Sequence, residues 1–231
     1  MVEGPRMSER ERIFARIREA LAESAPVPEA AGPGLPDAGS EAYRRVLPAV
    51  GVDFADRVAL FARQSAELKT VFLRVPDLAA LGVELHRLRD AENWARVASH
   101  AGGLTDAAVA ALTLPVLRTD QAYDKSDLAA CPVGISECEV LVAQTGSVLV
   151  TTRSSGGRAL SVLPPHHVVL ARSAQLVAGL PDAFAHLRQR YGDHFPSMIS
   201  FITGPSRTGD IERILVLGAH GPRQLTVFLL D

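Results

Sequence analysis

From about residue 41 onward, helical patterns alternate with short β-branched segments, and this alternation constrains the fold more than any other feature. Segment 54–68 ("FADRVALFARQSAEL") has the pattern of a helix, and 69–75 ("KTVFLRV") that of a strand. We expect 77–88 to be a short helix that runs into a second strand, and 91–103 to be a helix ended by its glycines. Such alternation is typical of an α/β sheet covered by helices on both faces.

The alternation of helices and strands ends near residue 139. Segment 139–152 ("EVLVAQTGSVLVTT") predicts two strands joined by a tight turn at 144–146. Further strands are expected at 166–171, 198–203 and 224–230, with a helix at 182–192. We therefore predict an α/β fold with a mixed sheet flanked by helices, whose later half contains a hairpin.

The N-terminal 40 residues differ in character from the rest. Segment 8–23 predicts an amphipathic helix, with Ser8 and Glu11 in the spacing of a capping box. Its apolar face is formed by Ile13, Phe14, Ile17 and Leu21. The following segment, 24–40, contains four prolines and three glycines, a composition typical of a tether. We predict two parts, 1–40 (amphipathic helix and flexible tether) and 41–231 (α/β domain), and leave open whether the helix docks on its own domain or on a partner.

Charge and hydrophobicity limit the partners. The formal net charge is −2, from 24 basic and 26 acidic residues, so no overall field attracts nucleic acid or an anionic membrane. No uninterrupted apolar stretch approaches the ~20 residues that span a bilayer, and the N-terminus lacks the pattern of an export signal. We expect a cytoplasmic protein with no membrane span.

The chain has only two cysteines, Cys131 and Cys138, too few to hold an iron–sulfur cluster of its own. We expect two reduced, buried thiols. The adjacent His166 and His167 begin a predicted strand and should point to opposite faces. Because no His, Cys and carboxylate spacing indicates zinc or iron, we predict no metal site and no cofactor in this chain.

Segment 204–212 ("GPSRTGDIE") is the densest cluster of candidate binding residues. Gly204 lets the backbone approach a ligand, and Ser206 and Thr208 offer hydroxyls. Free N–H groups before a helical turn would favour an anion, which Asp210 opposes. Asp210 fits better as an acceptor for a ligand hydroxyl or as a partner for a cation. The alternative is that Asp210 caps a helix that begins at Ile211.

A second candidate segment is the turn at 143–147, "AQTGS". The hydroxyls of Thr145 and Ser147 and the backbone at Gly146 could face a common pocket, or this turn could simply be the corner of a hairpin. Glu137, upstream in "ISECE", could supply a carboxylate to the same pocket.

Two further candidates are weaker. His220 in "GAHGP" has space around it because glycines flank it, and it could be catalytic or a structural hydrogen-bonding residue. Segment 152–158 ("TRSSGGR") resembles an anion-binding loop in which Arg153 or Arg158 would pair with a carboxylate or phosphate, but a flexible turn is the alternative. Our catalytic candidates are therefore Asp210, His220 and Glu137.

Three separated motifs resemble those of the lactate-utilisation (LUD) domain family, and among its members the short, cluster-free C-type proteins. They are "GISECEVLVAQTGSVLVTT", "GGRALSVLPPHHVVL" and "ISFITGPSRTGDIERILVLGAHGPRQLTVFLLD". The resemblance covers residues 41–231. It implies a fold of the NagB/RpiA/CoA-transferase type and a role in oxidising L-lactate to pyruvate with iron–sulfur partner proteins. This chain departs from the family pattern at Gln144, where Glu is common, and at Gly209, where Ala is usual.

Three functions remain open. The first is a non-redox component of a lactate-oxidation assembly that binds iron–sulfur proteins and a small acid or nucleotide-like ligand. The second is a free-standing enzyme of CoA-transferase or sugar-phosphate-isomerase type, and the third is a ligand-binding scaffold without catalysis. Gln144 counts against a glutamate nucleophile, so we favour the first. The ligand pocket would be lined by Thr145, Gly146, Ser147, Arg158, Gly204, Ser206, Thr208 and Asp210.

Overall fold

The computed structural model describes residues 8–22, 47–211, 214–217 and 221–231. The chain divides into two units, Met1–Val46 and Leu47–Asp231. In the first unit, helix α1 (Glu9–Ala22) begins with the predicted capping box: the Ser8 N–H donates to the Glu11 carboxylate at 2.7 Å, and the Glu11 N–H donates to the Ser8 hydroxyl at 3.3 Å. The side chains of Ile13, Phe14 and Ile17 are exposed on this helix.

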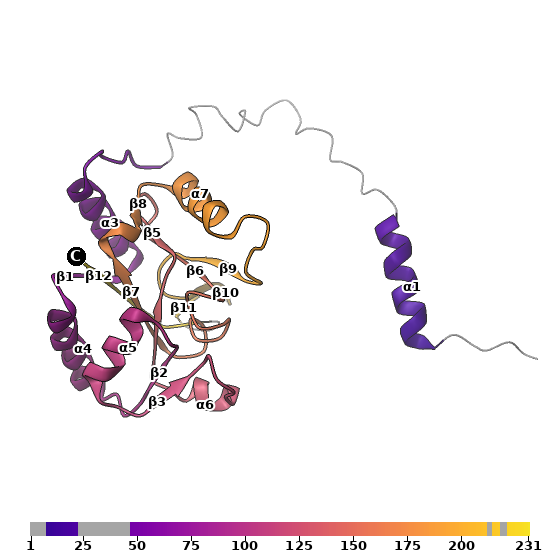
Figure 1. Cartoon of the computed structure of the whole chain (residues 1–231), viewed down its shortest axis with the longest axis horizontal. Coiled ribbons are helices and arrows are strands. Elements are labelled where there is room, and N and C mark those ends of the chain that lie inside the picture. The colour runs from indigo at the N-terminus through magenta and orange to yellow at the C-terminus, as the bar shows by residue number, and fades with distance from the viewer. Residues whose placement is uncertain (1–7, 23–46, 212–213, 218–220) are drawn as a thin grey trace, which may run out of the picture. The chain divides into compact units, whose positions relative to one another are not determined.

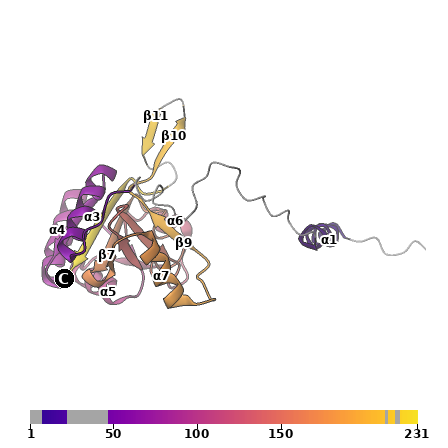
Figure 2. The ribbon, with the colours of Figure 1, turned by 90° about the horizontal axis from the view of Figure 1, so that it is seen from above.

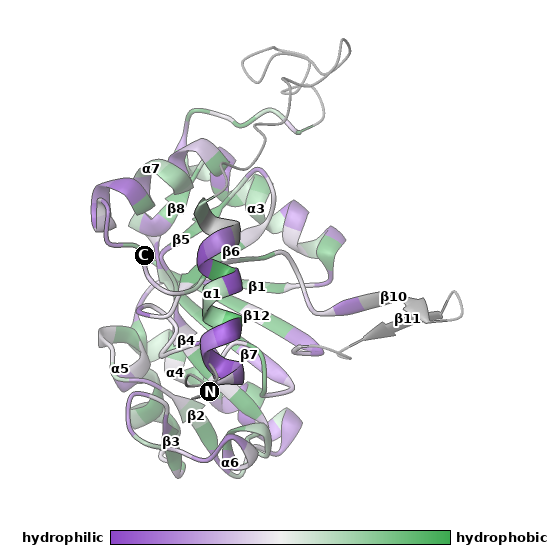
Figure 3. Cartoon of the chain, turned by 90° about the vertical axis from the view of Figure 1, so that its right-hand side faces the viewer, coloured by the Kyte–Doolittle hydropathy of each residue, from purple (hydrophilic) through white to green (hydrophobic). Residues whose placement is uncertain are grey.

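The second unit is built on a six-stranded parallel sheet with the order β1-β12-β7-β4-β2-β3 (Figure 1). The strands are β1 (Val71–Val75), β2 (Val97–Ser99), β3 (Val116–Arg118), β4 (Val133–Glu137), β7 (His166–Arg172) and β12 (Gln224–Leu230). Strands buried on both faces are expected to be almost continuously apolar. Figure 3 shows this hydrophobic character in the strands of the sheet.

Different elements cover the two faces of this sheet. Helices α4 (Leu78–Glu92) and α5 (Gly103–Leu112) pack on one face, where Val168 and Leu170 of β7 point. Helix α3 (Phe54–Leu68) and a second sheet pack on the other face, against Val169 and Ala171. The predicted α/β class, with helices flanking a sheet, is confirmed.

The second sheet has four strands in the order β8-β5-β6-β9. These are β8 (Leu176–Val177), β5 (Val140–Val142), β6 (Ser147–Thr151) and β9 (Ile199–Ile202), and helix α7 (Leu180–Tyr191) packs on them. Strands β5 and β6 form the predicted hairpin, but it belongs to this separate sheet rather than to the parallel one. A short helix, α6 (Lys125–Ala129), and a 3-10 turn, η1 (Ser173–Gln175), complete the fold.

Two expected elements between residues 77 and 103 are wrong. Residues 77–88 contain no strand, because α4 continues to Glu92 and ends at Asn93, which has a left-handed conformation with φ 55°. Segment 91–103 is not a helix, because it contains β2, a three-residue strand buried between β3 and β4. The burial of β2 comes from its neighbours in the sheet, which local periodicity does not report.

The alternative in which a helix begins at Ile211 is also wrong. Strand β10 (Arg207–Ile211) pairs antiparallel with β11 (Ile214–Leu217) instead. Figure 2 shows these two strands standing away from the sheets. Asp210 therefore lies in a strand and does not cap a helix.

Candidate functional site

Two of the predicted segments meet at the C-terminal end of α3. The hydroxyls of Thr145, Ser147 and Thr203, which we call the hydroxyl cluster, form a chain in which Ser147 lies 2.8 Å from each of the other two. Thr145 and Ser147 come from the β5–β6 turn, and Thr203 directly follows β9. The structure therefore brings the turn at 143–147 next to Thr203, the residue before segment 204–212.

Close packing on α3 gives the glycines in these two turns a physical reason. Gly146 has φ +64°, and a Cβ there would lie 2.8 Å from Gln64 Cβ. Gly204 has φ +88°, and its Cβ would lie 3.0 Å from the Leu68 carbonyl oxygen. Side chains at both positions would be strained and crowded by α3. At Gly146 and Gly204, the group that comes close to the backbone is therefore helix α3 of the protein itself.

The rest of segment 204–212 continues away from α3. Ser206 donates its backbone N–H to the Pro222 carbonyl at 2.9 Å, and the Arg207 guanidinium donates to the Leu68 carbonyl oxygen. Arg207 therefore anchors the segment to the C-terminal end of α3, where a cation is favoured. Thr208 and Asp210 lie in β10, and His220 falls outside the described residues, so their part in a pocket stays a prediction.

Glu137 does not join the hydroxyl cluster. It ends β4, and its Oε1 accepts hydrogen bonds from the backbone N–H groups of Leu104 at 2.8 Å and Thr105 at 3.3 Å. The carboxylate therefore caps the N-terminus of α5, whose own N-cap residue, Gly102, has no side chain to do so. A Cβ on Gly102 would lie 2.5 Å from Oε1, so glycine is needed to admit this carboxylate.

Sequence reasoning missed the polar groups beside Glu137. His100 follows β2, and its Nε2 lies 3.3 Å from the Glu137 backbone N. Arg118, at the end of β3, donates to the His100 carbonyl at 2.7 Å and pairs with Asp106 at 2.7 Å. The hydrogen bond from Arg118 lowers the pKa of Asp106. We call His100, Asp106, Arg118 and Glu137 the carboxyl-edge cluster.

The topology makes this edge a natural place for a ligand. The chain leaves β2 toward α5 on one face of the sheet, whereas it leaves β4 toward β5 on the other face. Crevices outside the carboxyl ends of such diverging strands are the usual binding sites of open α/β sheets. The only sequence signal was Glu137, because His100 lay in a segment expected to be helical.

Segment 152–158 folds over this edge. Gly156 has φ +61°, and a Cβ there would lie 2.4 Å from His100 Cβ. The Ser155 hydroxyl donates to the Thr151 carbonyl at 2.7 Å, and Arg158 donates to the Ser197 carbonyl at 2.9 Å. These bonds favour an ordered turn. Binding of a ligand anion by Arg158 stays a prediction.

The buried carboxylate of Glu139 anchors Thr151, the residue directly before segment 152–158. Glu139 is fully buried and accepts hydrogen bonds from the Tyr191 hydroxyl at 2.6 Å and the Thr151 hydroxyl at 2.7 Å, and Arg190 lies 3.3 Å away. Burial acts to raise the pKa of Glu139, but these hydrogen bonds and the charge of Arg190 outweigh it, and the pKa is lowered. Glu139 therefore stays ionised and ties β6 to α7.

The two adjacent histidines point to opposite faces, as expected for a strand. The Nδ1 of His166 lies 2.9 Å from the Glu92 carboxylate and its Nε2 2.9 Å from the Thr226 hydroxyl. His167 Nε2 lies 2.8 Å from the Ser136 hydroxyl, and its buried Nδ1 has no partner. Burial, with a smaller effect of His166, lowers the pKa of His167 to about 3. His167 is therefore neutral at physiological pH.

Both cysteines are buried free thiols, and burial raises the pKa of each. Neither has the exposure or the lowered pKa of a reactive thiolate. Within the part of the chain that the structure describes, no three His, Cys, Asp or Glu side chains are grouped so that they could hold a metal ion. In the same residues, every helix is too short or too polar to cross a bilayer.

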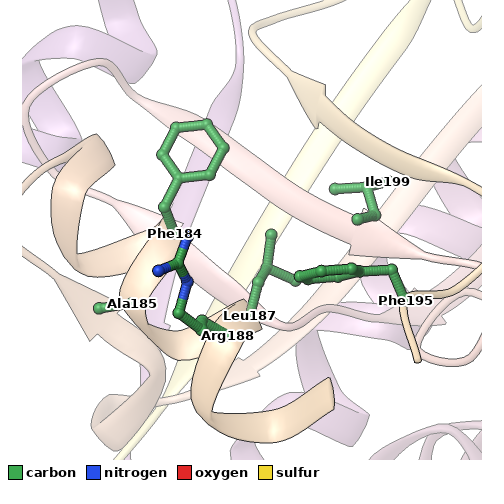
Figure 4. A pocket seen from close by; sticks show the side chains of 6 residues that line it. All are labelled: Phe184, Ala185, Leu187, Arg188, Phe195 and Ile199. Atoms are coloured by element: carbon green, nitrogen blue, oxygen red, sulfur yellow. The ribbon is translucent and has the colours of Figure 1, made fainter. Parts of the chain in front are cut away.

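An apolar hollow of about 500 Å³ lies beside α7 (Figure 4). The side chains that line it are Phe184, Ala185, Leu187, Arg188, Phe195 and Ile199. Phe184 and Phe195 are both about half exposed. The hollow lacks the convergent polar groups of a catalytic site.

Comparisons with known proteins agree on one family. The family model of the LUD domain matches residues 69–230. Lactate utilization protein C of Shouchella clausii is 37% identical over 100 residues, which are 43% of this chain and 44% of that protein. The protein of the same name from Bacillus licheniformis is 35% identical over 101 residues, 43% of this chain and 42% of that protein. The chain thus matches less than half the length of these curated relatives.

A solved structure shows the same fold. The crystal structure of a DUF162 family protein from Deinococcus radiodurans superimposes with a TM-score of 0.62 at 19% identity, and the match covers 78% of this chain and 100% of that one. At this identity the likeness concerns the fold alone. Because the family model matches well over half of the residues, the chain belongs to the LUD domain family.

Proposed function

We propose that this protein is a non-redox, ligand-binding component of an L-lactate utilisation system in which lactate is oxidised to pyruvate and iron–sulfur partner proteins carry the electrons. The observation that carries the proposal is the match to relatives named Lactate utilization protein C, at 33–37% identity. A cytoplasmic location, where such partners would be met, is part of the proposal.

The properties of the two cysteines support the proposal that the partner proteins, and not this chain, carry the electrons. Oxidation of a 2-hydroxy acid to a 2-oxo acid releases two electrons, which need an acceptor. Cys131 and Cys138 are the chain's only cysteines, too few for a cluster held by this chain alone. Both are buried with raised pKa values, so neither is poised as a thiolate. The acceptor would therefore be supplied by the partners.

For the ligand, we propose a pocket that begins at the hydroxyl cluster. Thr145, Ser147 and Thr203 present contiguous hydroxyls at the ends of strands, the kind of place where loops carry binding groups. Hydroxyls that both donate and accept suit a small hydroxy acid or a nucleotide-like ligand. Asp210 would accept a ligand hydroxyl there.

The alternative of a free-standing acyl-transfer enzyme has less support. Such an enzyme needs a nucleophile at the turn, where this chain has an amide, Gln144. The Gln144 amide donates to the Pro48 carbonyl at 2.9 Å. It therefore anchors the start of the domain, which is a structural role.

The test is a pull-down of the tagged full-length protein from lactate-grown cells, combined with complementation of a deletion strain. We expect iron–sulfur proteins to copurify and the wild-type gene to restore growth on lactate. Asp210→Asn should impair that growth with little effect on thermal stability, whereas Asp193→Asn, at an exposed position after α7, should behave as wild type. Recovery of a lone protein that turns over an acyl-CoA would overturn the proposal.

A further inference from the structure

An open pocket of about 290 Å³ lies at the N-terminal end of α3, the opposite end of that helix from the hydroxyl cluster. It is lined by Phe54, Arg57, Ser173, Ala174 and Leu176. Ser173 and Ala174 belong to η1, which follows the carboxyl end of β7 directly. The pocket therefore lies at the edge of the parallel sheet where α/β proteins bind ligands.

Arg57 is the residue in this pocket whose positive charge could bind an anion. Its Nη1 donates to the Leu176 carbonyl oxygen at 3.3 Å, which fixes the position of the guanidinium. Its Nε is buried and has no hydrogen-bond partner. Asp53 and Asp56 share its helical turn, but among the described residues neither forms an ion pair with it. The Arg57 side chain also lines the pocket, so a carboxylate bound there would meet a guanidinium that is already held in position.

Two further charged groups near the pocket, Arg74 and Asp231, are paired with each other. Arg74 holds Asp231 through two hydrogen bonds, at 2.7 and 2.8 Å, and its guanidinium lies 5.6 Å from the centre of the Phe54 ring. The Ser173 hydroxyl lies 2.9 Å from the Leu230 carbonyl oxygen and 3.1 Å from Asp231 Oδ1. The Arg74–Asp231 pair is neutral overall, which leaves the positive charge of Arg57 uncompensated by these neighbours.

We propose that this pocket binds a short-chain monocarboxylate, whose carboxylate accepts from the Arg57 guanidinium and whose carbon chain lies against Phe54 and Leu176. A volume of about 290 Å³ equals the share of roughly ten water molecules in the liquid, enough for a short acid. The apolar walls, with Arg57 as the one cation among the lining residues, disfavour a dianionic phosphate. The proposal rests on the pocket alone and not on the role in lactate utilisation.

The test is a titration of the ¹⁵N-labelled full-length protein with propionate, L-lactate and inorganic phosphate, followed by the amide resonances of Ser173 and Ala174. We expect saturable shifts with the two monocarboxylates, with a Kd on the order of 1 mM, and none with phosphate. Arg57→Gln should weaken binding about 10- to 100-fold, the effect of losing a charge-assisted hydrogen bond. Arg63→Gln, on the exposed face of the same helix, should bind as wild type.

A second variant keeps the test decisive if Arg57→Gln does not fold. Ala174 is exposed, so Ala174→Phe should fill the pocket without disturbing the core or Arg57, and it should abolish the shifts. The proposal is overturned if no monocarboxylate produces saturable shifts, if phosphate binds equally well, or if Ala174→Phe binds as tightly as wild type. None of these outcomes depends on which proteins copurify from lactate-grown cells.

Discussion

The buried neutral state of His167 predicts a loss of stability in mild acid. Its pKa in the folded protein is about 3, whereas an unperturbed histidine titrates near 6.5. As the pH falls below 6.5, His167 takes up a proton in the unfolded chain but not in the folded protein. The free energy of unfolding therefore decreases until the pH approaches the pKa of His167 in the folded state. Between pH 7 and pH 5 this single residue accounts for a loss of about 2 kcal/mol. Because pH 5 is well above the folded pKa, this figure barely depends on its value.

The assay is urea denaturation at pH 7 and pH 5 of the wild type and of His167→Gln. Glutamine is neutral at both pH values, so the variant should lose about 2 kcal/mol less than the wild type on acidification, whatever its stability at pH 7. His194→Gln is the matched control, because His194 is exposed, and it should follow the wild type. Equal losses for wild type and His167→Gln would show that His167 takes up its proton in the folded state and refute the reasoning.

Three other changes are predicted to act on stability. Gly134→Ala should cost about 1–3 kcal/mol in urea denaturation, because its Cβ would lie 2.7 Å from the Leu160 carbonyl oxygen, whereas Gly103→Ala meets nothing within 4 Å and should be tolerated. Glu139→Gln should lower stability by about 2 kcal/mol, since Tyr191 and Thr151 lose a charged acceptor; no change in melting temperature would contradict this. Deletion of residues 1–40 should leave a folded domain, measured by circular dichroism and melting temperature, and an insoluble product would place α1 in the core.

The elements predicted correctly are those specified by their own local sequence. Strand β12 carries a continuous apolar run, so its burial between β1 and β7 could be read from its composition. The β5–β6 hairpin has a glycine at 146 with positive φ, as tight turns require. The capping box of α1 depends on residues three positions apart, Ser8 and Glu11.

The errors lie where tertiary contacts decide the structure. Strand β2 has three residues, too few to show a period, and its neighbours in the sheet bury it. Consequently the sequence places His100, which follows β2, in a predicted helix and gives no reason to expect it in a site. Asp210 before an apolar run satisfied the rule for a helix start, but pairing between β10 and β11 prevailed.

Arg57, the residue proposed to bind a carboxylate, shows why such a candidate can escape sequence reasoning altogether. In the amphipathic pattern of α3 it looks like one of several charged residues, no different from Arg63. What distinguishes it is the Leu176 carbonyl oxygen, from a residue 119 positions later in the chain, which holds its guanidinium beside η1. Only the topology brings the exit of β7 next to the first turn of α3. A residue whose surroundings come from such distant segments can be assigned a role from the structure, and the paired comparison of Arg57→Gln with Arg63→Gln measures that difference directly.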